Sequence, residues 1–116
     1  QFYFITYGNL DTYELTVDSF KNQKGLMVPK GYTLDSATAY FYFPKQKEFF
    51  TAEYRPDFDS IKFFKYVNLL VPGSIVTFEG IRLSNAQGYT FRPHNQVKYH
   101  FVGTAPRKKS KKSRND

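Results

Sequence analysis

Two residue types are missing from this sequence of 116 residues, and each absence excludes a kind of site. The sequence contains no cysteine, which rules out disulfide bonds, thiolate nucleophiles and cysteine-based zinc or iron–sulfur sites. It also contains no tryptophan, which argues against an aromatic platform for sugars. Any function must therefore rest on other side chains.

Long apolar runs are also missing. The segment VNLLV (residues 67–71) is typical of the longest runs, far below the roughly 20 residues that a membrane-spanning helix requires. No apolar core of a secretory signal is present either. The sequence begins at Gln1 rather than Met, so we expect either an exported protein that has lost its signal peptide or a part of a longer chain. A periplasmic or exported location is our prediction.

Catalytic and metal-binding motifs are absent from the sequence. It contains no GxSxG, Walker, dinucleotide-binding or HExxH motif. The two histidines, His94 and His100, have no carboxylates at a ligand spacing. Asp57 and Asp59 are two residues apart but lack the glycine and third ligand of a calcium loop, and Asp59 or Ser60 better suits a helix cap. We predict a protein that is not an enzyme and binds no cofactor or metal.

Positive charge is concentrated at the C-terminal end. Net charge is +7, but residues 103–116 hold six basic residues and one acidic residue, so residues 1–102 carry only 7 − 5 = +2. This terminal segment has no large apolar side chain, and we predict a disordered basic tail that attracts anionic surfaces with little selectivity. The six basic residues of the tail are Arg107, Lys108, Lys109, Lys111, Lys112 and Arg114.

Aromatic residues dominate what is present, with 13 Phe and 10 Tyr. These residues favour half-buried pleated surfaces, and they alternate with polar residues in several short segments separated by turn signals. We predict strands within residues 2–7, 13–20, 37–43, 49–54, 74–83, 89–91 and 96–102.

Individual segments refine this prediction. Residues 37–43 and 49–54 suit a hairpin, and Gly80 suits a bulge. Residues 59–70 suit one short helix whose apolar face would include Ile61, Phe64 and Val67.

Together the segments predict an all-β fold for residues 1–102. An immunoglobulin-like β-sandwich of about seven short strands with one short helix fits best, and a small barrel is the competitor. The side chains predicted to point inward are Leu15, Val17, Val76, Phe78, Val97, Tyr99 and Phe101.

Two stretches carry a resemblance to a known family. The segments YELTVDSF (residues 13–20) and LLVPGSIVTFEGIRLSNAQGYTFRPHNQVKYHFV (residues 69–102) resemble the C-terminal periplasmic domain of the gliding-motility protein GldM, also called PorM. The shared features are VxSF at Val17–Phe20, GSxVxFxxI at Gly73–Ile81, a polar turn at Ala86–Gly88 and a closing strand after Arg92. The membrane helix and long stalk of that family have no counterpart in these residues.

The resemblance implies a non-enzymatic, exported protein–protein interaction module. Its partners would be other proteins of the cell envelope or further copies of itself, within the type IX secretion and gliding machinery of Bacteroidetes-like bacteria. The alternative is an OB-like, nucleic-acid-binding small β-barrel that stacks bases on Tyr40, Tyr42 or Phe91 and contacts phosphates through the basic tail.

Overall fold

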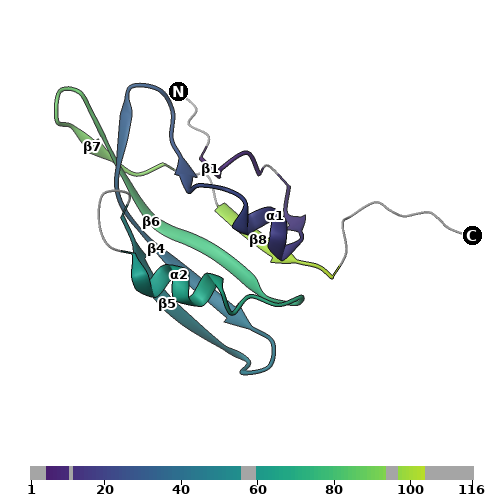
Figure 1. The fold of residues 1–116 in the computed structure, drawn as a ribbon. Coiled ribbons are helices and arrows are strands. Elements are labelled where there is room, and N and C mark those ends of the chain that lie inside the picture. The colour runs from purple at the N-terminus through teal and green to yellow at the C-terminus, as the bar shows by residue number, and fades with distance from the viewer. Residues whose placement is uncertain (1–4, 11, 56–59, 94–96, 104–116) are drawn as a thin grey trace, which may run out of the picture.

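The computed structural model describes residues 5–10, 12–55, 60–93 and 97–103. Eight strands and two helices lie within them (Figure 1). The strands are β1 (Thr6–Tyr7), β2 (Glu14–Leu15), β3 (Leu26–Met27), β4 (Tyr32–Phe43), β5 (Glu48–Tyr54), β6 (Ile75–Asn85), β7 (Thr90–Phe91) and β8 (Val97–Phe101). The helices are α1 (Val17–Lys21) and α2 (Ile61–Val67). Neither described helix is long and apolar enough to cross a membrane.

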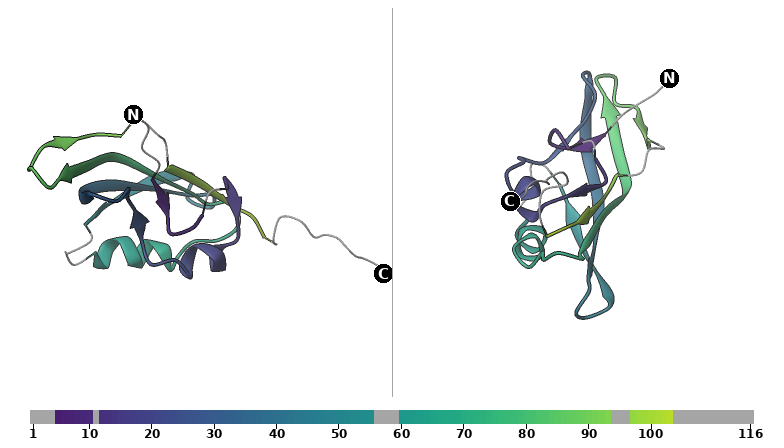
Figure 2. Two further views of the ribbon diagram at one scale, coloured as in Figure 1. Left: turned by 90° about the horizontal axis from the view of Figure 1, so that it is seen from above. Right: turned by 90° about the vertical axis from the view of Figure 1, so that its right-hand side faces the viewer.

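The strands form two open sheets. Five strands of the larger sheet run in the order β2-β8-β6-β4-β5, and β7 pairs with β6 as the sixth. Neighbouring strands are antiparallel except β2 and β8, which are parallel. The smaller sheet, β1-β3, lies with α1 and α2 on one face of the larger sheet (Figure 2). The prediction of an all-β, sandwich-like fold is confirmed, with helices contributing to the second layer.

The central strands confirm the predicted hairpin and bulge. Strands β4 and β5 pair from Ala37↔Tyr54 to Phe43↔Glu48. Gly80 has a φ of 62°, and the pairing of β4 with β6 shifts by one residue beside it. A second shift of opposite sense follows at Asp35, whose carboxylate accepts a hydrogen bond from the hydroxyl of Ser84. The two irregularities cancel, so Leu34 and Leu83 face each other again and are both buried.

The segment predicted as a strand over residues 13–20 is only partly a strand. Strand β2 ends at Leu15, and Val17 begins helix α1. Thr16 caps this helix, because its Oγ1 accepts the N–H of Ser19 at 3.2 Å. Phe20 is therefore fully buried by the helix, whereas Val17, predicted to point inward, is half-buried. The other six predicted inward side chains are buried.

Helix α2 confirms the predicted helix but not its predicted apolar face. Phe63 and Val67, four residues apart, are buried, whereas Ile61 and Phe64 are exposed. A spacing of four keeps two side chains on one face of a 3.6-residue helix at least as well as a spacing of three, so the sequence allowed either face. Ser60 lies at the N-cap position without a side-chain capping bond, and its Oγ donates to the carbonyl of Arg55 at 3.2 Å.

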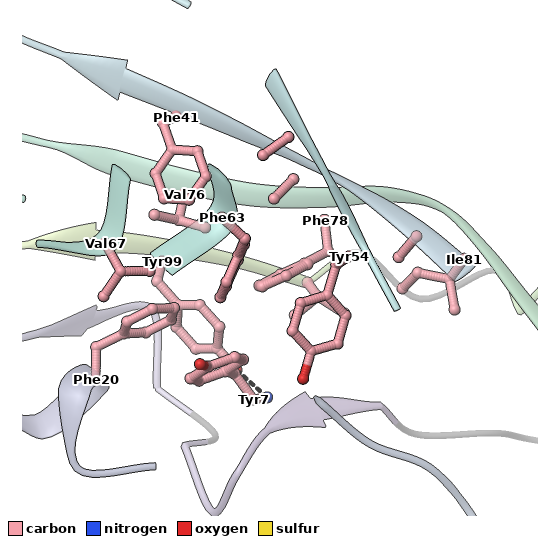
Figure 3. Close-up of a cluster of buried hydrophobic side chains, with 14 of the residues drawn as sticks. Tyr7, Phe20, Phe41, Tyr54, Phe63, Val67, Val76, Phe78, Ile81 and Tyr99 are labelled. Atoms are coloured by element: carbon pink, nitrogen blue, oxygen red, sulfur yellow. Dashed lines mark hydrogen bonds between the residues drawn. The ribbon is translucent and has the colours of Figure 1, made fainter. Parts of the chain in front are cut away.

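Aromatic rings fill the space between the two layers (Figure 3). Tyr7 stacks on Phe20 with ring centroids 4.1 Å apart, and on Phe78 at 5.6 Å. Phe63 of α2 points toward the large sheet and contacts the rings of Tyr54 and Phe41. The high content of Phe and Tyr is thus explained largely by the core.

Two tyrosine hydroxyls attach the N-terminal segment to the large sheet. The hydroxyl of Tyr99 on β8 accepts the N–H of Tyr7 at 2.8 Å and donates to the carbonyl of Leu10 at 2.9 Å. The hydroxyl of Tyr54 on β5 accepts the N–H of Leu26 on β3 at 3.1 Å. The bond to the Tyr7 N–H is buried, so it satisfies a backbone donor that packing separates from water.

Candidate interaction surface

The larger sheet has one face that no described element covers, which we name the outer face (Figure 2). Side chains alternate between the two faces along each strand. On β4 the residues buried beneath the helices are Ala39, Phe41 and Phe43. Tyr40 and Tyr42, which lie between them, therefore point to the outer face. Both tyrosines are half-buried. Strand β4 therefore carries aromatic rings on both of its faces.

A row of large side chains crosses the outer face from one edge to the other. Strand pairing aligns Phe49 with Tyr42, Tyr42 with Ile75, and Ile75 with His100. The rings of Phe49 and Tyr42 lie 5.2 Å apart, and Phe49 is 61% exposed. At the far edge the ring of Tyr13 lies 5.7 Å from that of His100. With a strand spacing of about 4.8 Å, the aligned row from Phe49 to His100 spans about 14 Å.

Charges of both signs border this aromatic row. Glu53 and Glu79 flank Thr38 from the two neighbouring strands. Lys98 lies opposite Thr77 on β8. Groove walls that bind nucleic acid concentrate lysine and arginine along the path of the phosphates. Glu53 also pairs with Arg55 at 3.0 Å, so charges of both signs are mixed on this face and the cations are not concentrated as in a phosphate-binding groove.

Only two of the three predicted base-stacking residues lie together. Tyr40 and Tyr42 are neighbours on the outer face of β4. Phe91 lies on β7, where its ring packs edge-on against Tyr32 with centroids 4.9 Å apart, and both rings pack against the core. Phe91 is thus separate from the two tyrosines and in contact with Tyr32, and its role in base stacking stays a prediction.

The outer-face residues that sequence reasoning missed are Phe49 and Ile75. Phe49 was assigned to a strand, but its face depends on the register of the hairpin, which the four residues between Phe43 and Glu48 determine. The alternation that predicts Val76 and Phe78 to point inward also predicts that Ile75 points to the opposite face. The signal was therefore present, since the neighbours of buried residues on a strand face the other side.

Strand β5 forms one edge of the large sheet. It pairs with β4 and with no other described strand, so one of its sides carries backbone groups without a strand partner. Such an edge can accept an added strand from another protein. Phe49 is a residue of β5, so a strand added at this edge would lie beside the aromatic row as well.

The histidines and carboxylates do not form a metal site in the described part of the chain. No three His, Asp or Glu residues gather there. His100 Nδ1 lies 3.7 Å from the carboxylate of Glu14, a partly exposed pair on neighbouring strands. His94, Asp57, Asp59 and the basic residues of the tail lie outside the described residues.

Comparison of the chain with protein-family models, with curated proteins and with solved structures found no match. The outer face, the β5 edge and the sequence are therefore the features that bear on function.

Proposed function

We propose that this chain is a non-enzymatic protein–protein interaction module that binds its partner through the outer face and the β5 edge. The observation that supports this most is the row of Phe49, Tyr42 and Ile75 across three adjacent strands. Side chains of this kind form the centres of protein interfaces, where aromatic rings contribute most of the binding energy. The mixed charges beside them suit the polar rim of such an interface.

The resemblance of residues 13–20 and 69–102 to the GldM domain adds the cellular setting to this proposal. Within it, the module is exported to the periplasm and joins other envelope proteins of the type IX secretion and gliding machinery. The outer face and the β5 edge would then be the parts that contact those proteins or a further copy of the chain.

A photo-crosslinking experiment tests this proposal. Phe49 is replaced by benzoyl-phenylalanine in the source cells, because its exposed ring lies at the junction of the outer face and the β5 edge. Tyr89, 71% exposed in the β6–β7 turn, is replaced in the same way as the matched control. We expect Phe49, but not Tyr89, to give a crosslink to one protein, which a further Tyr42→Ser change weakens. The proposal fails if the crosslinks from the two positions are the same.

The nucleic-acid alternative is separated by a titration with single-stranded nucleic acid. If Tyr40 and Tyr42 stack bases, then Tyr40→Ala and Tyr42→Ala each weaken binding by about 1–3 kcal/mol at near-physiological salt. Under our proposal, binding comes from the basic tail, falls steeply with salt and does not respond to these two changes. A loss at both tyrosines would replace the interaction module with the nucleic-acid alternative.

A further inference from the structure

A second exposed apolar surface lies in the layer of helices. Four large apolar side chains are exposed on α2 and in the loop that follows it: Ile61 (68%), Phe64 (47%), Leu69 (55%) and Val71 (46%). We name these four residues the α2 patch. They lie close together in the chain, and exposed apolar side chains that gather in this way mark interaction sites.

The α2 patch faces away from the sheet. Phe63 and Val67 are buried between α2 and the sheet, so the side chains on the opposite side of the helix, Ile61 first among them, point outward. The helices cover one face of the large sheet, and the outer face is the other (Figure 2). The exposed side of α2 and the outer face therefore lie on opposite sides of the large sheet and can be occupied at the same time.

Positive charges are interleaved with this patch. Between Ser60 and Phe78 the sequence contains Lys62 and Lys65 and no acidic residue. Both lysines are exposed on α2. A short helix with apolar side chains and lysines on its solvent side is typical of segments that lie at the surface of an anionic membrane.

The chain leaves the last strand beside the same loop. The N–H of Gly73 donates to the carbonyl of Phe101 at 2.8 Å, and a Cβ atom built on Gly103 would lie 3.9 Å from Cγ of Pro72. In the sequence, six basic residues from Arg107 to Arg114 follow Gly103. Gly103, from which the sequence continues into the polybasic segment, therefore lies beside the loop that carries Leu69 and Val71.

We propose that the α2 patch docks on an anionic lipid bilayer, with its apolar side chains in the interface and Lys62, Lys65 and the basic tail against the headgroups. One weak signal gives only marginal membrane binding, whereas apolar insertion and a polybasic segment together give stable attachment. A second copy of the chain is a worse occupant, because it would bring the lysines and tails of two molecules together. Nucleic acid is also a worse occupant, because it would leave Ile61 and Leu69 in water.

The lack of tryptophan allows a direct test of which surface meets the lipid. Ile61→Trp places the only tryptophan of the full chain in the α2 patch, and Tyr89→Trp places it in the distant β6–β7 turn as a matched exposed control. Each variant is mixed with vesicles of phosphatidylcholine alone and with vesicles containing equal parts of phosphatidylglycerol and phosphatidylcholine. We expect the emission of Ile61→Trp, but not of Tyr89→Trp, to shift to the blue with anionic vesicles only.

Three results would overturn this proposal. The first is no shift for Ile61→Trp in the presence of vesicles that sediment the protein, because the tail alone would then make the contact. The second is an equal shift for Tyr89→Trp, which would show adsorption without a preferred face. The third is an equal shift of Ile61→Trp with single-stranded nucleic acid, which would assign the patch to a soluble polyanion.

Two changes in the full chain separate the contributions to vesicle partitioning. Replacing Lys108, Lys109, Lys111 and Lys112 together by Gln removes four cations, each of which favours an anionic surface by about fivefold, so we expect a loss of at least about a hundredfold. Leu69→Ser removes one exposed apolar side chain, and we expect a further loss of about threefold to tenfold. Met27→Ser, also at an exposed position, is the control and leaves partitioning unchanged. Equal partitioning of Leu69→Ser and Met27→Ser would contradict insertion.

Discussion

Tyrosine hydroxyls add hydrogen bonds to the apolar packing that holds the N-terminal segment. Tyr99 contacts Phe20 by its ring and bonds two backbone groups of residues 7 and 10 by its hydroxyl. One side chain thus joins the last strand to the first strand and to the turn after it. Tyr54 does the same for β3, and the space at Gly25 accommodates its hydroxyl, because a Cβ atom there would lie only 2.2 Å from it.

The change Tyr99→Phe tests this role. It keeps the ring but leaves the buried N–H of Tyr7 without its acceptor and the carbonyl of Leu10 without this donor. We expect the free energy of unfolding to fall by about 1–3 kcal/mol in urea titrations. Tyr89→Phe, at a position that is 71% exposed, is the control and should change it by less than about 0.5 kcal/mol. Equal effects would mean that the hydroxyl of Tyr99 is not a structural link.

Alkaline pH should weaken the fold through the same residues. Burial raises the pKa of Tyr7 well above its ordinary value of 10.0. It also raises the pKa of Tyr54, although the bond from the Leu26 N–H opposes this. The folded state therefore holds these protons more tightly than the unfolded state, so their contribution is complete below pH 10 and is lost as the pH rises above it.

Urea titrations at a series of pH values around and above 10 measure this loss. Tyr7→Phe removes the group whose pKa is raised most, so its free energy of unfolding should fall less steeply with pH than that of the unchanged protein. Parallel slopes for the two proteins would exclude Tyr7 as a cause.

At the scale of elements, one face of helix α2 packs against the large sheet and the other is exposed to solvent. Phe63→Ala removes a fully buried ring between α2 and the sheet, and we expect a loss of about 3–5 kcal/mol in the free energy of unfolding. Phe64→Ala makes the same chemical change at the next residue, which is 47% exposed, and we expect a loss below about 1.5 kcal/mol. Thermal or urea unfolding of both variants checks the orientation of the helix. The reverse order of losses would restore the face that the sequence spacing predicted.

The sequence predicted where most strands and helix α2 lie, but it predicted less well which side chains of each element are buried. Alternation identified the buried sides of β6 and β8, because a strand with one face in the core must place every second residue there. Alternation gave the wrong structure at α1, because the alternating pattern continues through Thr16. Only the hydrogen bond from the Ser19 N–H to the Thr16 hydroxyl distinguishes the start of a helix from a strand there. Alternation also failed to assemble the outer face, because the alignment of Phe49, Tyr42 and Ile75 depends on the pairing of segments far apart in the chain.

At the scale of the whole molecule, the basic tail and the folded part differ in composition. Residues 103–116 have no large apolar side chain that could add to the core. A chain ending at Val102 should therefore melt within a few degrees of the complete chain in a calorimetric scan at moderate salt. A large fall in melting temperature would show that the tail contributes to the fold.

The parallel pairing of β2 with β8 affects the order in which the chain acquires its structure during synthesis. Leu15 of β2 pairs with Phe101, and the N–H of Tyr7 bonds the hydroxyl of Tyr99, so β2 gains its sheet partner, and β1 this link to the large sheet, only after residues up to Phe101 have emerged from the ribosome. The β4–β5 hairpin and its neighbour β6 have no such delay. Contacts that close such long loops are formed slowly. We therefore expect the central hairpin to assemble first, with Phe20 lacking its ring contacts to Tyr99 and Phe101 until β8 has been made.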